Sequence, residues 1–102
     1  MISKPSTATK PPVVISDSAT LSQRTLSKGT EFISLHYLNT TAGVGRVDIY
    51  DGIIAPSNLR ITLGAAAASG TDDFNPSQNF TFINEPIVVF TTGTGAVTIL
   101  RN

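Results

Sequence analysis

Apolar and polar residues alternate along much of the chain, in short runs that turn residues separate. The alternation is clearest in Glu31–Leu38, where Ile33, Leu35 and Tyr37 share one expected face, and in Val44–Tyr50. A period of two residues is typical of strands with one buried face. No sustained helical period and no internal repeat accompanies it. The pattern therefore predicts an all-β chain, and it puts Phe32 on the opposite face from Leu35.

Strand signals recur at short spacing over the rest of the chain. They are Val13–Ile15, Leu59–Leu63, Phe80–Ile83, Ile87–Thr92 and Ala96–Arg101. Gly93-Thr94-Gly95, between the last two, predicts a closing hairpin, and the alanine-rich stretch from Gly64 to Gly70 is expected to be a loop. About seven or eight short strands separated by turns predict a small antiparallel β-sandwich or jelly roll.

The N-terminal part of the chain has a different character. Residues 1–12 are rich in Ser, Thr, Pro and Lys, and they hold too little apolar surface to offset the entropy lost on ordering. Residues 16–30 are mostly polar. We therefore expect an extended basic arm and connector over residues 1–30 and a β-sandwich domain over residues 31–102.

Charge is scarce and unevenly spread. Charged residues make up 14% of the chain and the formal net charge is zero, so part of the surface is expected to serve a partner. Residues 1–30 hold four of the seven Lys and Arg residues, whereas residues 31–102 hold six of the seven Asp and Glu residues. This complementarity suits an arm of one copy lying on the body of another, and an arm that wraps its own domain fits equally well.

Several classes of protein are disfavoured by composition. Cysteine is absent, which excludes disulfides and thiolate metal sites. No apolar run approaches the roughly 20 residues that a membrane span needs, so no membrane association is expected. Residues 1–12 contain no apolar segment of the secretory type, so no secretory signal is expected there.

The residues that could carry catalysis do not form a convincing set. His36 is the single histidine and falls in mid-strand, where an exposed or interface histidine is the favoured interpretation over a member of a catalytic triad. Asp48 with Asp51, and Asp72 with Asp73, are paired carboxylates. Asp72 and Asp73, adjacent in an expected loop, are favoured as solvated turn residues, and a calcium site at this pair stays open. No enzyme activity and no cofactor are expected.

The glycines and the basic residues also favour a structural role. Gly93-Thr94-Gly95 lacks the Lys-Ser/Thr and the helix that follow the glycines of a phosphate loop. The four cations of the arm are spaced widely and lack interleaved aromatic residues, which is a weak signature of nucleic-acid binding. We therefore expect a protein partner with an acidic surface, and no nucleic acid.

The size of the predicted domain favours self-association. A body of roughly 70 residues buries only about 60% of its unfolded surface, and such domains are marginal in stability. Without disulfides or an evident metal, oligomerisation is the remaining common means of stabilisation. The last strands are apolar on both faces. We therefore predict a homo-oligomer, with a trimer favoured, whose interface includes Ile87, Val88, Val89 and Phe90.

Two segments carry a resemblance to a known family. Val47-Asp-Ile-Tyr-Asp-Gly52 and Val88-Val-Phe-Thr-Thr-Gly-Thr-Gly-Ala-Val-Thr-Ile99 resemble the strands and turns of small β-sandwich structural proteins of tailed bacteriophages. The resemblance covers roughly residues 30–102. It implies a virion protein assembled in the host cytoplasm, of the capsid cement or decoration type, and it carries over no active-site residues.

This resemblance makes the major capsid protein, or another virion protein, the expected partner. The cement hypothesis assigns the clamp on neighbouring capsomers to the arm residues Lys4, Lys10, Pro11 and Pro12. Two alternatives stay open. One is a neck or tail subunit. The other is a head-fibre or tail-fibre module that binds a receptor or glycan through the loops Asp51–Asn58 and Ala65–Asn79.

Overall fold

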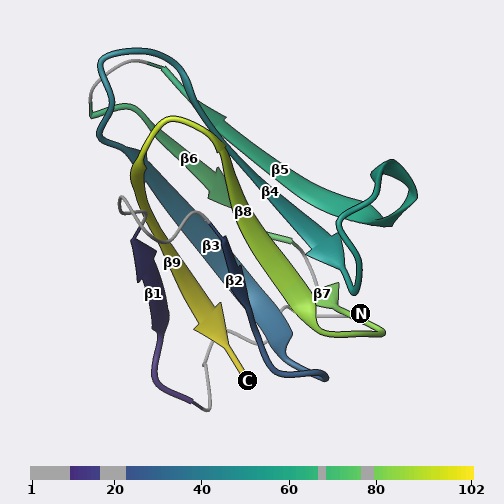
Figure 1. Ribbon diagram of the computed structural model, residues 1–102. Coiled ribbons are helices and arrows are strands. Elements are labelled where there is room, and N and C mark those ends of the chain that lie inside the picture. Colours follow the sequence, from purple (N-terminus) through teal and green to yellow (C-terminus); the bar gives the residue numbers. More distant parts are fainter. Residues whose placement is uncertain (1–9, 17–22, 67–68, 77–79) are drawn as a thin grey trace.

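The strands of the chain pair into two antiparallel sheets that pack face to face (Figure 1). A computed structural model describes residues 10–16, 23–66, 69–76 and 80–102. Nine strands are described: β1 (Val13–Ser16), β2 (Gln23–Thr25), β3 (Glu31–Asn39), β4 (Gly45–Asp51), β5 (Leu59–Ala65), β6 (Thr71–Phe74), β7 (Phe80–Thr81), β8 (Pro86–Thr92) and β9 (Gly95–Arg101). A short 3-10 helix, Pro56–Asn58, precedes β5.

The strand order is that of a jelly roll. Sheet A has the order β1-β9-β3-β6, and β7 extends the same side of β3 beyond β6. Sheet B has the order β2-β8-β4-β5. Strands that follow one another in the chain mostly lie in different sheets, so the chain winds around the core as in eight-stranded jelly rolls. The predicted all-β sandwich is thus confirmed, and its nine strands occupy eight positions.

The core lies between the inner faces of the sheets. Its fully buried members come mainly from the four central strands: Leu35 and Tyr37 of β3, Val47 and Ile49 of β4, Val88 of β8, and Val97 and Ile99 of β9. These residues recur at every second position because side chains alternate between the two faces of a strand. The alternation predicted over residues 31–50 is therefore confirmed for Leu35, Tyr37, Val47 and Ile49.

Phe32 departs from the predicted alternation. The register between β3 and β9 shifts between Phe32 and Ser34, and the irregularity returns Phe32 to the core side, where its side chain is fully buried. Its ring lies 4.8 Å from the ring of Phe82. A bulge places two residues of one strand opposite one of the other, so a strict two-residue period fails across it.

The predicted closing hairpin is wrong. β8 belongs to sheet B and β9 to sheet A, so Gly93 and Thr94 carry the chain across the core instead of joining two paired strands. A glycine-rich turn shows where the chain reverses, but not whether the two strands pair or stack. Gly95 is needed at the crossing, because a Cβ atom there would collide with the carbonyl oxygen of Leu38.

The sandwich also extends into the range predicted to be arm and connector. β1 pairs with β9 and β2 pairs with β8, each as the edge strand of its sheet. Ile15 and Leu26 contribute buried side chains to the core. β1 confirms the strand predicted at Val13–Ile15. The three residues of β2 are all exposed, so no apolar signal separates this strand from a linker. Among the described residues no helix is long and apolar enough to cross a membrane.

The bulge at Phe32 yields a test of the core. We expect Phe32→Ala to lower the free energy of unfolding by about 3–5 kcal/mol, because the substitution empties a closed site. Leu38→Ala, at a position that is 37% exposed on the outer face of the same strand, should cost less than about 1 kcal/mol. Urea denaturation of both variants measures the difference, and equal losses would contradict the inward placement of Phe32.

Candidate functional site

Two connections meet at one end of the sandwich. β4 ends at Asp51 and β8 begins at Pro86, and these two residues are partners in the ladder of sheet B. The loop that follows β4 and the loop that precedes β8 therefore leave the sheet side by side, at the end of sheet B where the arrow of β4 ends and the ribbon of β8 begins (Figure 1). This arrangement brings residues 52–58 and 82–85 onto one surface.

Asp51 ties the two loops together. Its Oδ1 accepts a hydrogen bond from the backbone N–H of Asn84 at 2.7 Å, and its Oδ2 accepts from the N–H of Ile83 at 3.1 Å and from Nη1 of Arg60 at 3.2 Å. The N–H of Gly52 donates to the carbonyl of Glu85 at 3.0 Å. Four bonds between residues distant in the chain fix the path of both loops.

The charge of Asp51 is matched to its donors. Burial is the largest influence and by itself raises the pKa of this carboxyl, but the backbone hydrogen bonds from Asn84 and Ile83 and the charge of Arg60 together hold the pKa below its ordinary value. Asp51 is therefore ionised at neutral pH, and its hydrogen bonds are of the stronger, charge-assisted kind.

Aromatic packing attaches the loop that precedes β8 to the core. The rings of Phe74, Phe80, Phe82 and Phe32 follow one another with centroid separations of 5.6, 5.2 and 4.8 Å. The guanidinium of Arg60, which bonds Asp51, lies 4.9 Å from the centroid of the Phe80 ring. Such tilted and edge-on pairs add to the stabilisation from burial, so the segment that leads into Ile83 is anchored in the core.

Three isoleucines project from these anchored loops into solvent. Ile53 is 68%, Ile54 46% and Ile83 77% exposed. Burying a side chain of this size stabilises a protein by about 1.5–3 kcal/mol, a gain that these residues do not realise in the isolated chain. Exposed apolar clusters rimmed by polar groups are typical of surfaces that bind other proteins. We call Ile53, Ile54 and Ile83 the isoleucine surface.

A polar groove borders the isoleucine surface. It encloses about 510 Å³ and is lined by Lys28, Asp51, Gly52, Ile53, Asn58, Asn84 and Glu85. Lys28 comes from the turn between β2 and β3, so three connections contribute to the groove. An apolar centre with a polar rim is the usual anatomy of a protein interface.

A second buried carboxylate stabilises sheet B without reaching this surface. Asp48 is 2% exposed and accepts hydrogen bonds from Nε of Arg46 at 3.0 Å, Oγ1 of Thr62 at 2.9 Å and Oγ1 of Thr91 at 2.8 Å. Burial acts to raise its pKa, but these bonds and the charge of Arg46 hold the pKa below its ordinary value. Its donors come from β4, β5 and β8, so Asp48 crosslinks three strands.

The remaining candidate residues for chemistry lie on sheet A. His36 occupies an exposed strand face, as predicted, and its Nδ1 lies 2.6 Å from Oδ1 of Asp73 on β6. Asp72 accepts hydrogen bonds from the N–H groups of Gly64 and Asp73. In the described part of the chain, no three His, Asp or Glu side chains gather as a metal site would require.

The predicted clamp residues are partly described. Lys4 lies outside the described residues. Lys10, Pro11 and Pro12 are exposed, and the carbonyl of Pro11 accepts a hydrogen bond from Nε of Arg101 at 3.2 Å. This bond holds the end of the predicted arm beside β9.

The predicted oligomer interface needs correction. Val88 and Phe90 are buried in the core of the chain itself, whereas Ile87 and Val89 lie half-buried on the outer face of sheet B. β8 is a central strand, covered on one face by sheet A, and this accounts for the apolar character that was interpreted as a subunit contact. Only Ile87 and Val89 stay available to a second subunit.

The isoleucine surface was not predicted as an apolar surface, although one alternative assigned receptor or glycan binding to the loop Asp51–Asn58, which contains Ile53 and Ile54. Periodicity assigns isoleucine to the core, and here the adjacent pair Ile53-Ile54 directly follows the Asp51-Gly52 turn, where alternation has ended. Two apolar residues in sequence just after a turn were an available signal. Ile83 offered none, because its exposure depends on the bonds that Asp51 makes to it and to Asn84.

Comparison of the chain with protein-family models, with curated proteins and with solved structures found no match.

The Asp51 bonds predict local protection from hydrogen exchange. We expect Asp51→Ala to speed exchange of the Ile83 and Asn84 amide protons by roughly tenfold or more, because local opening no longer breaks a bond to a charged acceptor. Asp73→Ala, which removes a carboxylate from the outer face of sheet A, should leave both amides unchanged. NMR-detected exchange measures the rates, and equal protection in wild type and Asp51→Ala would contradict the proposed tie.

The two buried carboxylates predict how stability depends on pH. Because the pKa values of Asp48 and Asp51 are lowered in the folded chain, their stabilisation is present above the unfolded pKa, about 3.9, and is lost as the pH falls through the folded values. The free energy of unfolding should therefore be level from pH 7 to about 5 and fall below about 4. In Asp48→Asn it should be lower at pH 7 and fall less steeply in acid. Denaturation series at each pH measure both, and parallel acid profiles would count against this role of Asp48.

Proposed function

We propose that this chain is a structural subunit of a bacteriophage virion, of the capsid cement or decoration type, which docks onto a neighbouring virion protein through its isoleucine surface. The observation that carries this proposal is the exposure of Ile53, Ile54 and Ile83 on two loops. Asp51 and the packed phenylalanine rings hold these loops in place. A rigid apolar surface loses little conformational entropy when a partner covers it.

The fold supports the same proposal. Jelly rolls recur in viral capsid proteins as well as in lectins and cupins, so architecture alone leaves these functions open. The resemblance of residues 47–52 and 88–99 to strands and turns of phage structural proteins is the reason for proposing the virion among them. The major capsid protein is the proposed partner, and the exposed Lys10, Pro11 and Pro12 are proposed to add contacts as the clamp.

Self-association is part of the proposal. Partly exposed apolar strand residues that a second copy could cover include Ile87 and Val89 on the outer face of sheet B, and Val14, Leu38 and Leu100 on the outer face of sheet A. A trimer is the proposed assembly, because cement proteins of this kind would bridge several capsomers at once. A neck or tail subunit would use the same docking surface.

A receptor- or glycan-binding module is the second candidate. The groove beside the isoleucine surface presents the amides of Asn58 and Asn84 with the charged groups of Lys28 and Glu85, and such groups form hydrogen bonds with sugar hydroxyls. Its lining contains no aromatic ring, however, and an aromatic platform is a usual component of sugar sites. Saturable binding on a glycan array that Asn84→Ala abolishes would favour this candidate over the first.

Location of the protein in purified particles tests the virion proposal. In this experiment the chain is produced with a C-terminal epitope tag in the cells that assemble the particles. The released particles are then purified on density gradients. We expect the tagged chain to sediment with the particles and to appear at their surface in immuno-electron microscopy. Ile83→Ser should reduce the amount bound by at least about tenfold, since it removes an apolar contact worth about 1.5–3 kcal/mol.

The controls separate docking from folding. Val44→Ser removes an apolar side chain that is 66% exposed at the opposite end of the sandwich, and it should bind particles like wild type. Deletion of residues 1–12 should lower particle binding and particle heat resistance if the arm clamps capsomers. A tagged chain that never sediments with particles, although folded and present in the lysate, would refute the proposal.

A further inference from the structure

The four arginines of the described residues fall into two groups. Arg46 pairs with Asp48 and Arg60 pairs with Asp51, at 3.0 and 3.2 Å. Arg24 and Arg101 instead line one small cavity, together with Val13, Thr25, Leu26, Ser27 and Thr30. Among the described residues no carboxylate belongs to that lining, and Asp17, between β1 and β2 in the chain, lies outside the described residues.

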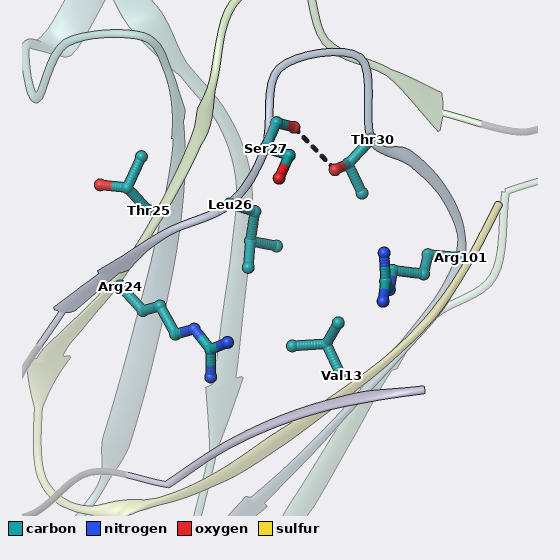
Figure 2. A pocket seen from close by; sticks show the side chains of 7 residues that line it. All are labelled: Val13, Arg24, Thr25, Leu26, Ser27, Thr30 and Arg101. Carbon is teal, nitrogen blue, oxygen red and sulfur yellow. Dashed lines mark hydrogen bonds between the residues drawn. The ribbon is translucent and has the colours of Figure 1, made fainter. Parts of the chain in front are cut away.

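The cavity lies at one side edge of the sandwich. β1 and β2 are the edge strands of sheets A and B on this side. At the opposite edge, Asp72 of β6 accepts a hydrogen bond from the N–H of Gly64 in β5. Figure 2 shows Arg24 and Arg101 on either side of Leu26 and Val13, with both guanidinium groups directed toward the space between them.

The described carboxylates are engaged elsewhere. Asp48 and Asp51 bind their arginines, Asp73 faces His36, Asp72 binds Gly64, and Glu31 accepts a hydrogen bond from Asn102. Glu85 lines the groove beside the isoleucine surface. The anion that would complete the cavity is therefore sought outside the described residues.

The donors of the cavity match a carboxylate. Each guanidinium presents five N–H groups in a planar fork, and Arg101 uses one of them on the carbonyl of Pro11. The forks suit the two oxygens of a carboxylate, which they bind in bidentate fashion. The cavity encloses about 140 Å³, several times the roughly 30 Å³ that one water molecule occupies in the liquid. A carboxylate group fits this volume, and Leu26 and Val13 would contact the methylene groups behind it.

The cavity adjoins the proposed docking surface. Ser27 lines the cavity and Lys28, the next residue, lines the groove beside the isoleucine surface. The turn that carries both residues is fixed to β8, since the N–H of Leu26 donates to the carbonyl of Pro86 at 2.8 Å. A protein that covers Ile83 and Ile53 is thus close enough to place a side chain in the cavity.

We propose that the Arg24–Arg101 cavity receives a glutamate or aspartate side chain of the protein that docks at the isoleucine surface. The identity of the occupant as a protein group rests on the proposed function, whereas the affinity of the cavity for a carboxylate does not. Lys10 is exposed, and the neighbouring Pro11 bonds Arg101, so Lys10 adds positive charge that favours an acidic partner.

A minimal peptide tests the cavity without the particle. The probe is the capped tripeptide acetyl-Gly-Glu-Gly-amide, titrated into the full chain at constant ionic strength and followed by NMR. We expect saturable shifts of the Arg24 and Arg101 side-chain Nε–H signals and of the amides of residues 25–30. Acetyl-Gly-Gln-Gly-amide, which has the same shape without the charge, should cause none.

Matched variants locate the binding. Arg24→Gln and, separately, Arg101→Gln should weaken binding of the glutamate peptide by about tenfold or more, as expected for loss of a charge-assisted hydrogen bond. Lys28→Gln removes the same charge from the neighbouring turn but outside the cavity, and it should change the affinity by less than about threefold. Denaturation of each variant verifies that it is folded.

Three outcomes would overturn the proposal. The first is the absence of saturable shifts with the glutamate peptide. The second is an equal loss of affinity in Lys28→Gln and Arg24→Gln, which would indicate nonspecific attraction. The third is binding of inorganic phosphate at least about tenfold tighter than the peptide, which would assign the cavity to phosphate groups. Peptide binding by a chain that never sediments with particles would retain the carboxylate site and reject the virion assignment.

Discussion

The fold depends on one constraint, namely that the inner faces of two small sheets must cover each other completely. A sheet of four or five strands is too narrow to bury its apolar residues by any other means, and the chain meets the requirement by crossing between the sheets at most of its connections. The crossings place β3 and β9 opposite β4 and β8, which supply most of the fully buried side chains. Burial of this kind is the main favourable term in folding.

The same constraint determines where polar groups lie. A carboxylate in a sandwich this thin has to be compensated where it stands, and Asp48 and Asp51 each collect three donors at the outer face or at the end of sheet B. Asp48 uses its donors to crosslink strands. Asp51, the last residue of β4, instead accepts hydrogen bonds from backbone N–H groups of a loop. These bonds attach the loop to the sheet and fix the conformation of the surface that the loop forms.

The sequence predicted the parts of this structure that follow from local periodicity. The class of fold, the central strands and most inward-facing residues of β3 and β4 could be predicted, because burial on one face of a strand leaves a period of two. The apolar run Val13–Ile15 predicted β1 as well. The bulge at Phe32, the crossing at Gly93 and the edge strand β2 could not be predicted, since each depends on which strand lies beside which. The candidate site escaped prediction for the same reason. Ile83 is exposed, and Arg24 faces Arg101, only through contacts between segments distant in the chain.

The distribution of arginines indicates a function for the edge of the sandwich formed by β1 and β2. Two of the described arginines, Arg46 and Arg60, bind buried carboxylates. At the edge formed by β1 and β2, Arg24 and Arg101 line a cavity in which no described carboxylate lies. An anion placed between two guanidinium groups is attracted by both. Near these arginines lie the three isoleucines of the isoleucine surface, which are exposed to solvent. Both features lie at the same end of the molecule, on either side of the turn at Ser27 and Lys28, so a single partner with an acidic side chain next to an apolar patch would cover both at once.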